Sequence, residues 1–415
     1  MQTPVPDYLQ ELLEDIMSDR RGHVADYIPV LAEAEPDQCA VALSTVHGST
    51  YSVGDDDVQF SVQSISKPFV YAAALEAMGG DAVDGKVGVE PSGEAFNELS
   101  LETGTHRPKN AMINAGAITV HSLFTAASGD HSERAAAVTR FLSRLAGRDL
   151  CLDEEVFHSE LQTAHRNLAI AHMLRTYDVL AEDPHDVVRG YTAQCSVAVT
   201  VKDLSMMAAT LANRGRQPRT GEQVVSPWVA RRTLSVMAAA GMYDGAGSWL
   251  TSVGIPAKSG VSGGLIGALP GQVGAAVFSP RLDVQGNSSR GIRAFSRLSA
   301  DMGMHLFESE VRTDSVIHGW SQDSDGATVR LQDELRFTGA EVLLNRLEGI
   351  PAGSAPVLFD LSNLHAVTDV GRRMLLEGMR RLRLDGHSIH LHDPQGRLPE
   401  PDMGDGTFPE LVEER

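Results

Sequence analysis

The stretch Phe60-Ser61-Val62-Gln63-Ser64-Ile65-Ser66-Lys67 decides which fold this sequence can form. Apolar residues at positions 58, 60 and 62 alternate with polar ones, which is typical of a half-buried strand. The residues that follow have a helical composition, and Pro68 is tolerated in a first helical turn. The sequence therefore predicts a junction between a strand and a helix, with Ser64 at the helix N-terminus.

Ser64 and Lys67 are neighbours on the surface of such a helix, because they are separated by about one turn. A serine hydroxyl needs an adjacent base to become a good nucleophile. A lysine can be that base when burial and neighbouring groups lower its pKa. The helix N-terminus also favours an alkoxide. The S-x-x-K spacing, which by itself is a weak pattern, thus indicates an activated serine.

A second motif, Lys258-Ser259-Gly260, precedes the apolar runs Leu265–Leu269 and Val273–Phe278. The order S-x-x-K and then K-[ST]-G resembles the penicillin-recognising serine enzymes, in which such a strand lines the cleft opposite the nucleophile. Their middle S-D-N or Y-x-N motif is missing here. That departure argues against a penicillin target and remains compatible with the fold.

The segment Gly260–Gly264 also satisfies G-x-S-x-G. A nucleophile elbow requires a strand before the serine and a helix after it, whereas strand-like sequence follows here. We interpret these glycines as positions of close backbone approach. On the N-terminal side of Ser64, we expect strands at Ser44–Tyr51 and Val58–Val62, joined by a turn at Gly54–Asp57.

The composition indicates a cytoplasmic protein of about two domains, at roughly 150 residues each. The 415 residues carry a net charge of −20, which opposes nucleic-acid binding, and include three scattered cysteines without a CxxC pair, which fit a reducing compartment. No apolar run approaches the roughly 18 residues needed to cross a bilayer. Pro4–Met17 reads as an acidic amphipathic helix rather than a signal peptide.

We divide the chain into a domain at 1–307, a polar linker at 308–315, a smaller domain at 316–396 and a tail at 397–415. In the smaller domain, Thr338 to Glu341 has capping-box spacing and Val357–Leu361 fits a buried strand. The tail is rich in proline, glycine and acidic residues, so we expect it to be disordered.

Nine segments, in order across about residues 20–295, jointly resemble the serine-dependent glutaminase family. Together they are far more specific than any one of them. The segments are Asp26–Pro29, Phe60–Lys67, Val89–Gly93, Asn114–Ile118, Ser159–Glu160 with Arg166–Asn167, Tyr191 with Cys195–Ser196, Gly241–Asp244, Pro256–Val261 and Gly286–Ser288.

The resemblance implies a mixed α/β fold similar to serine β-lactamases, with a mixed sheet and a helical subdomain. It implies hydrolysis of L-glutamine to L-glutamate and ammonia, with no metal or organic cofactor. Ser64 matches the nucleophile and Lys67 its activating base. Tyr191 and Tyr243 match the tyrosines beside that pair, which serve proton transfer and ligand contact; which of them moves the proton stays open.

The family's substrate-binding residues also have counterparts here. Glutamine is a zwitterion, so Glu160 suits its ammonium, while asparagine and tyrosine side chains suit its carboxylate or amide. Glu160 and Asn167 are separated by about two helical turns, so we expect them to share a helix face. The backbone N–H groups of Ser64 and Val261 match the oxyanion hole. The matching substrate-binding set is Tyr27, Ser64, Asn114, Glu160, Asn167, Tyr191, Tyr243 and Val261.

The second domain resembles a STAS domain, as found in anti-sigma-factor antagonists and the tails of sulfate transporters. The run Val357–Ser362, followed by Thr368–Gly371, carries this resemblance. Asp369 stands close to the serine that antagonists phosphorylate, and either mimics phosphoserine or caps the next helix; we favour the cap. His390 and His392 alternate on an expected strand, with His387 before it, and we interpret them as an exposed polar face rather than a metal site.

The leading hypothesis is therefore a glutaminase that forms a dimer or tetramer, with a STAS module for regulation, assembly or a protein partner. It predicts no nucleic-acid or membrane partner. One alternative is a penicillin-interacting hydrolase or peptidase. The absence of an S-D-N motif and of a signal peptide argues against it. Another is a STAS-based binding protein with an inactive hydrolase scaffold. This second alternative is disfavoured because every catalytic position carries the expected residue type.

Overall fold

The computed structural model describes residues 4–93, 98–125, 131–307, 316–323 and 326–412. The chain divides into two compact units, one formed by Leu9–Arg297 and the other by Met1–Tyr8 together with Leu298–Arg415. Both units combine helices with sheets, as predicted for the α/β class. The division falls inside helix α13 (Ser289–Met302), earlier than the expected boundary. The expected linker at 308–315 lies outside the described residues.

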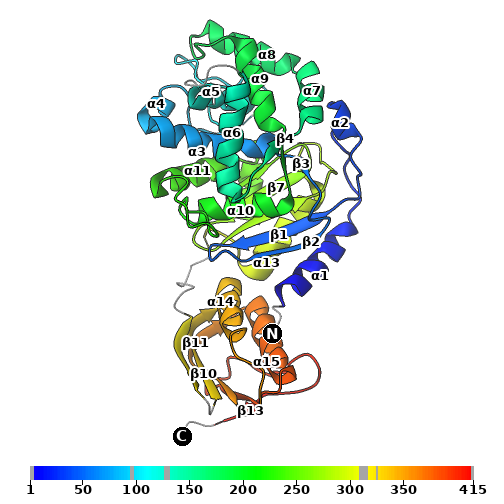
Figure 1. Ribbon diagram of the computed structural model, residues 1–415, viewed down its shortest axis with the longest axis vertical. Coiled ribbons are helices and arrows are strands. Elements are labelled where there is room, and N and C mark those ends of the chain that lie inside the picture. Colours follow the sequence, from blue (N-terminus) through cyan, green and yellow to red (C-terminus); the bar gives the residue numbers. More distant parts are fainter. Residues whose placement is uncertain (1–3, 94–97, 126–130, 308–315, 324–325, 413–415) are drawn as a thin grey trace. The chain divides into compact units, whose positions relative to one another are not determined.

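A five-stranded antiparallel sheet forms the base of the larger unit, in the order β2-β1-β8-β7-β6. Helix α10 (Val201–Ala212) lies over this sheet (Figure 1). Gly274 permits this close approach, because a Cβ there would lie 2.1 Å from the amide nitrogen of Ala209. The strands are β1 (Ala40–Thr45), β2 (Thr50–Gly54), β6 (Ala257–Ser259), β7 (Gly264–Leu269) and β8 (Val273–Phe278).

The strands before Ser64 differ from the expectation. The chain turns at 46–49, where the N–H of Thr45 donates to the carbonyl of Ser49, so β1 pairs with β2 and not with the segment at 58–62. That segment contributes β3 (Phe60–Ser61) to a separate sheet in the order β3-β5-β4. Alternation of apolar and polar residues indicates that a strand is half-buried, but it does not indicate which strand it pairs with. The other two strands of this sheet are β4 (Cys151–Leu152) and β5 (Val197–Val199).

Helices form the rest of the larger unit, and α5, α6, α8 and α9 gather at one end of it (Figure 1). One apolar core surrounds α3, whose first ten residues are all buried, and a second lies between α5, α8 and α9. The helices are α1 (Val5–Met17, shared between the units), α2 (Pro29–Ala32), α3 (Ser66–Met78), α4 (Gly80–Asp84), α5 (Asn114–Thr125), α6 (His131–Ala146), α7 (Glu154–Gln162), α8 (His165–Thr176), α9 (Pro184–Cys195), α11 (Pro227–Ala240) and α12 (Ala246–Ser252).

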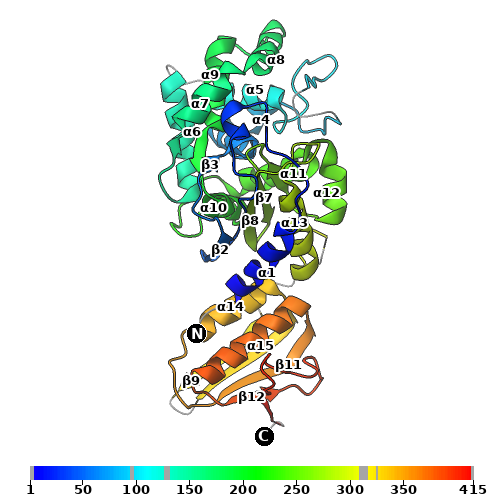
Figure 2. The ribbon, with the colours of Figure 1, turned by 90° about the vertical axis from the view of Figure 1, so that its right-hand side faces the viewer.

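The smaller unit contains a five-stranded sheet in the order β13-β12-β11-β10-β9. Only the β9–β10 pair is antiparallel, and the helices α14 and α15 connect the parallel strands β10, β11 and β12. Figure 2 shows α15 lying along this sheet. The elements are β9 (Ile317–Asp323), β10 (Gly326–Leu335), α14 (Phe337–Leu347), β11 (Val357–Val367), α15 (Asp369–Leu384), β12 (Ile389–His392) and β13 (Glu410–Leu411).

Both helix starts in this unit differ from the expectation. Helix α14 begins at Phe337 without a side-chain cap, so the Thr338–Glu341 capping box does not form, and both residues are buried instead. Thr368 caps α15 by accepting the N–H of Gly371, while Asp369 is the first helical residue. Asp369 is thus not the cap, although its charge is favourable in the first turn.

The C-terminal segment is also more ordered than its composition suggested. Strand β13 pairs in parallel with β12, and the side chains of Leu398 and Met403 are buried. These apolar contacts, together with the strand pairing, order a segment that otherwise has the composition of a disordered tail. On β12, His390 and His392 are half-buried on the same face, opposite the buried Ile389 and Leu391.

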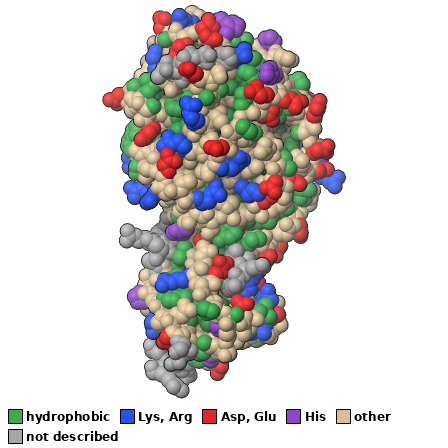
Figure 3. Space-filling view, in the orientation of Figure 1, with side chains coloured by type: hydrophobic (Ala, Val, Ile, Leu, Met, Phe, Trp, Pro, Cys, Tyr) green, Lys and Arg blue, Asp and Glu red, His purple; other side chains and the backbone are tan. Residues whose placement is uncertain are grey.

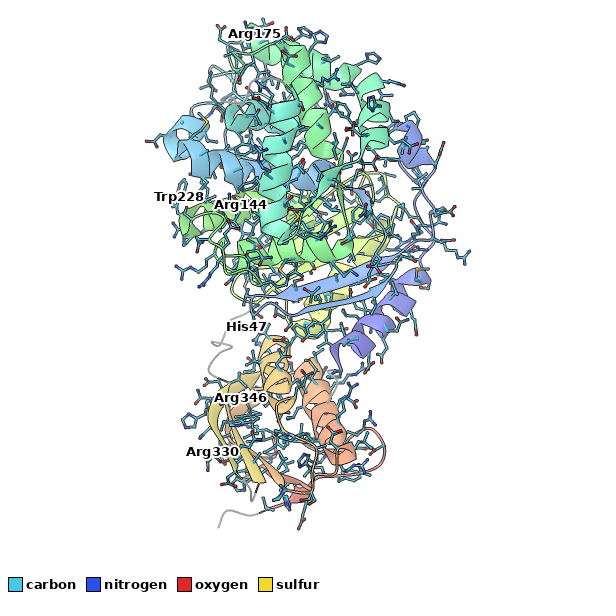
Figure 4. All side chains as sticks on the ribbon, in the orientation of Figure 1. His47, Arg144, Arg175, Trp228, Arg330 and Arg346 are labelled. Carbon is cyan, nitrogen blue, oxygen red and sulfur yellow. The ribbon has the colours of Figure 1, made fainter. Side chains whose placement is uncertain are left out.

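The acidic and basic side chains are interspersed on the face shown in Figure 3, with hydrophobic ones between them in small areas. Figure 4 labels several surface residues, including Arg144 on α6, which pairs with Glu222, and Arg346 on α14, which lies over the Trp320 ring. Within the described ranges, no helix is long and apolar enough to cross a membrane, and no cluster of three or more His, Cys, Asp or Glu side chains could hold a metal ion.

Candidate active site

Ser64 lies in a short 3-10 helix, η1 (Gln63–Ile65), that leads directly into α3. The preceding residue, Gln63, has a φ of +50°, a left-handed conformation that redirects the chain from β3 into the helix. Such strain in a non-glycine residue requires support from its surroundings, and it often occurs at functional sites. The hydroxyl of Ser66 gives such support by donating to the carbonyl of Gln63 at 2.7 Å.

Lys67 lies on the first turn of α3, where its side chain is only 1% exposed. Its Nζ donates to Ser64 Oγ at 2.9 Å and to Asn114 Oδ1 at 2.7 Å. Burial lowers the pKa of Lys67 to about 8, while the Cys195 thiol and the Glu160 carboxylate act in the opposite direction. A lysine with this pKa is partly neutral near physiological pH, so it can accept the proton of Ser64.

Two buried tyrosines lie in this region, Tyr243 next to Ser64 and Tyr191 near Tyr243 and Glu160. Tyr243 is in the 3-10 helix η2 (Tyr243–Gly245), where its φ of +56° is again left-handed. Its hydroxyl contacts the carbonyl of Ser259 at 3.5 Å and is hydrogen-bonded to the side chain of Ser64. Burial raises the pKa of Tyr243 to about 12, and it raises the pKa of Tyr191 well above its usual range. Both phenols therefore remain protonated and available as donors at neutral pH.

Glu160, near the end of α7, is 9% exposed and faces the same region. Its Oε2 accepts a hydrogen bond from Gln63 Nε2 at 3.0 Å. Burial raises the pKa of Glu160 to about 7, although the bond from Gln63 and the charge of Lys67 lower it. A buried carboxylate held by a neutral amide is suited to receive a cationic ligand.

Asn114 connects Lys67 to Asn167, because its Oδ1 accepts from Lys67 Nζ and its Nδ2 donates to Asn167 Oδ1 at 3.0 Å. Asn167 lies on α8, whereas Glu160 lies on α7, so the expectation that they share one helix face is wrong. The chain leaves the helix after Gln162, and α8 begins at His165. The two side chains approach the site from separate helices instead.

Val261 follows β6 in a tight turn rather than a nucleophile elbow. The N–H of Gly260 donates to the carbonyl of Gly264, where β7 begins, and no helix follows. A Cβ on Gly260 would lie 3.2 Å from the carbonyl oxygen of Val62, so the turn passes close to the loop that carries Ser64. This is the close backbone approach that the glycines indicated.

Tyr27 lies in a segment that packs on Val261. An apolar cluster joins Val261 to residues around α2 and to Leu282, and Tyr27 precedes Ile28 of that cluster. Tyr27 is 55% exposed, and its pKa is raised by burial, with smaller contributions from the nearby Tyr243 and Glu160.

The structure adds residues that the sequence analysis did not single out. Gln63 links the turn at Ser64 to Glu160, and its position directly before Ser64 was the available signal. Gln194 and His121 form a buried hydrogen-bonded pair behind α3, for which no motif gave a signal. Asn287 accepts a hydrogen bond from the hydroxyl of Ser259 and so links the segment at 286–288 to β6.

The chain is similar to known proteins along nearly its full length. The glutaminase family model matches residues 22–307. A glutaminase from Corynebacterium efficiens is 48% identical over 404 residues, which cover 97% of this chain and 96% of that protein.

Solved structures give a matching result. The crystal structure of Mglu in its glutamate form is 45% identical, has a TM-score of 0.74 and covers 95% of this chain and 99% of that one. The structure of a probable glutaminase is 36% identical with a TM-score of 0.70, and it covers 73% of this chain and 99% of its own. Shorter relatives thus match only part of the sequence.

Proposed function

The chain belongs to the glutaminase family, and we propose that it hydrolyses L-glutamine to L-glutamate and ammonia through an acyl-enzyme formed on Ser64. One observation carries this mechanism. The buried amine of Lys67 lies 2.9 Å from Ser64 Oγ and 2.7 Å from Asn114 Oδ1, so a base with a lowered pKa is held against the hydroxyl.

In the acylation step, neutral Lys67 accepts the proton of Ser64 as Oγ attacks the side-chain amide carbon of glutamine. The amide oxygen becomes an oxyanion in the tetrahedral intermediate. When this intermediate collapses, the amide nitrogen takes up a proton and leaves as ammonia. That proton comes from Lys67 through the hydroxyl of Tyr243 or of Tyr191. Water then attacks the ester carbon with Lys67 again as the base, the bond from that carbon to Ser64 Oγ breaks, and Oγ takes the proton back from Lys67 as glutamate is released.

The backbone N–H groups of Ser64 and Val261 form the proposed oxyanion hole. Ser64 lies at the N-terminal end of α3, where backbone N–H groups have no intrahelical partner. An important donor in such a site contributes about 3–4 kcal/mol to the transition state. The tight turn after β6 brings Val261 close to the same loop, as the short approach of Gly260 to Val62 indicates.

Recognition of the zwitterion follows from the residues around the pair. Ionised Glu160 binds the α-ammonium, and Asn167 with Tyr27 and Asn114 binds the α-carboxylate or the amide. A ligand that lacks one of these groups leaves buried polar atoms unpaired, which is strongly unfavourable. The structure of the relative Mglu in its glutamate form is compatible with a site for this class of ligand.

The decisive experiment measures ammonia release from L-glutamine by the intact chain and by Ser64→Ala. We expect the substitution to lower kcat by more than about 10³-fold, because no other hydroxyl occupies the place of the nucleophile. Ser235→Ala on the exposed face of α11 is the matched control and should retain full activity. A folded Ser64→Ala protein with wild-type activity would refute the acyl-enzyme.

The same assay with L-asparagine tests the substrate. Asparagine is shorter by one methylene, so its amide does not reach Ser64 when Glu160 and Asn167 hold the amino-acid group. We expect kcat/KM to be lower for asparagine by at least about 100-fold. Equal rates for the two amides would contradict the proposed binding mode.

For the smaller unit we propose a STAS-like module, 316–396, that serves regulation or assembly. The support is its sheet with two connecting helices and the position of Asp369 at the start of α15. We also propose that the protein forms a dimer or tetramer. Sedimentation equilibrium of the intact chain and of Asp369→Lys tests both statements. A monomeric wild type would exclude assembly, and an unchanged mass and unchanged kinetics in the variant would remove Asp369 from any such role.

A further inference from the structure

A buried network of hydrogen bonds runs from the turn at Gln63, through Gln194 on α9, to His121 on α5. The hydroxyl of Ser66 donates to the Gln63 carbonyl at 2.7 Å and accepts from Gln194 Nε2 at 3.0 Å. Gln194 Oε1 lies 2.9 Å from His121 Nδ1. The three side chains that form this hydrogen-bonded network are all buried; they are Ser66, Gln194 and His121.

The direction of each bond follows from the donors available. A serine hydroxyl has one proton, and Ser66 uses it on a carbonyl, so Ser66 must accept from the amide nitrogen of Gln194. The amide oxygen of Gln194 then faces His121, and an oxygen only accepts. His121 therefore carries its proton on Nδ1, which fixes its tautomer.

The position of the His121 ring is also fixed by packing. A Cβ on Gly190 would lie 2.5 Å from His121 Nε2, so the ring fills the space against α9. Within the described residues, Nε2 has no hydrogen-bond partner. The ring also packs edge-to-face on Tyr191, with centroids 6.4 Å apart and an interplanar angle of 74°. Burial lowers the pKa of His121 to about 4, so the ring is neutral at physiological pH.

These contacts converge on the one turn that sets the direction of Ser64 Oγ. Gln63 holds a left-handed φ, its carbonyl is held by Ser66, and its side chain is held by Glu160. We propose that Gln194 and His121 are positioning residues which, through Ser66, hold the Gln63 turn and thereby keep Ser64 aligned with Lys67. This inference rests on the proposed role of Ser64 as the nucleophile.

The test uses substitutions in the intact protein that interrupt the hydrogen-bonded network at different residues. Gln194→Met and His121→Leu keep similar volumes and remove the polar groups. Displacing a reacting group by about 1 Å can lower the rate roughly 100-fold, so we expect kcat to fall roughly 10- to 100-fold. KM for glutamine should change by less than about twofold, because none of the substrate-binding residues is altered.

A conservative variant and a matched control separate positioning from general destabilisation. His121→Asn retains an N–H donor near the place of Nδ1 and should recover kcat to within about threefold of the wild type. Gln217 is likewise fully buried, and its amide oxygen accepts from the backbone of Arg219 and Thr220 in the loop after α10. Gln217→Met should lower the melting temperature and leave kcat unchanged.

Ser66→Ala provides a second route if the larger changes prevent folding. It interrupts the same network with a small substitution, so its loss of kcat should match that of Gln194→Met and should not add to it in the double variant. Wild-type kcat in Ser66→Ala, or a loss in Gln217→Met equal to that in Gln194→Met, would overturn the inference. A wild-type chain inactive on glutamine, or an active Ser64→Ala, would instead refute the proposed function.

Discussion

The Nζ of Lys258 lies 3.8 Å from the centroid of the Tyr243 ring, and the hydroxyl of that ring is bonded to Ser64. The same amine donates to the carbonyl of Ser259 at 2.9 Å. Burial lowers the pKa of Lys258 well below its usual range, and the nearby charge of Lys67 adds to this effect. Lys258 thus connects strand β6 to the tyrosine that contacts Ser64.

We expect Lys258→Met to lower kcat roughly tenfold, because the Tyr243 ring loses its contact with the buried amine and the carbonyl of Ser259 loses a hydrogen bond that contributes about 0.5–1.5 kcal/mol. Methionine keeps the unbranched shape and the apolar contacts, so the melting temperature should change little. Steady-state kinetics and thermal unfolding of the two proteins provide the measurement. An unchanged kcat would show that the amine does not contribute to the placement of Tyr243.

The pH dependence of kcat/KM should have an acidic limb between about pH 7 and 8. Lys67 acts as a base only when it is neutral, above its pKa of about 8. Glu160 binds the ammonium only when it is ionised, above its pKa of about 7. At low pH Lys67 is protonated and Glu160 is neutral, so kcat/KM should rise with pH through both pKa values.

Initial rates at constant ionic strength and subsaturating glutamine measure this limb. Glu160→Gln should weaken binding and leave a limb with a single pKa, that of Lys67, which should fall below about 8 because the Glu160 charge that raises it is removed. A profile that is flat from about pH 6 to 8.5 would exclude Lys67 as the base whose titration controls the rate.

Features that depend on local spacing could be predicted from the sequence. The i, i+3 relationship on a helix places Lys67 next to Ser64, and the apolar runs after Lys258 become β7 and β8. The strand partners could not be predicted, because alternation at 58–62 fits β3 in any sheet. The break between α7 and α8 could not be predicted either, because the separation of Glu160 and Asn167 also fits one continuous helix.

Contacts between distant helices gave no sequence signal at all. Gln194 reaches Ser66 across a separation of 128 residues, and neither residue lies in a pattern that distinguishes it from other buried polar side chains. The opposite error occurred at the C-terminus, where composition predicted disorder and two buried side chains, Leu398 and Met403, hold the segment. The average composition of a segment does not indicate that a few of its apolar side chains are buried.

Asn167 should control affinity more than turnover. Asn167→Ala removes the acceptor of the Asn114 Nδ2 group and a proposed ligand of the substrate, but leaves the bond from Lys67 to Asn114 in place. We expect KM to rise about tenfold or more, with a smaller change in kcat. Asn167→Asp keeps the acceptor and adds a negative charge, so it should raise KM further if the substrate carboxylate lies there. A KM below that of the alanine variant would place the carboxylate elsewhere.

Gly190→Ala tests how tightly His121 is held. An added Cβ would lie 2.5 Å from His121 Nε2 and 3.3 Å from Cε1, so the ring or α9 must move. Such overpacking costs about 1–3 kcal/mol, and the midpoint of urea unfolding should fall accordingly. Gly247→Ala in α12 is the matched control, because nothing lies within 4 Å of its added Cβ. There the loss of unfolded-chain entropy should stabilise the protein by about 0.5–1 kcal/mol. The two substitutions add the same methyl group to a helix, so a similar midpoint in both variants would mean that the contact with His121 yields without cost.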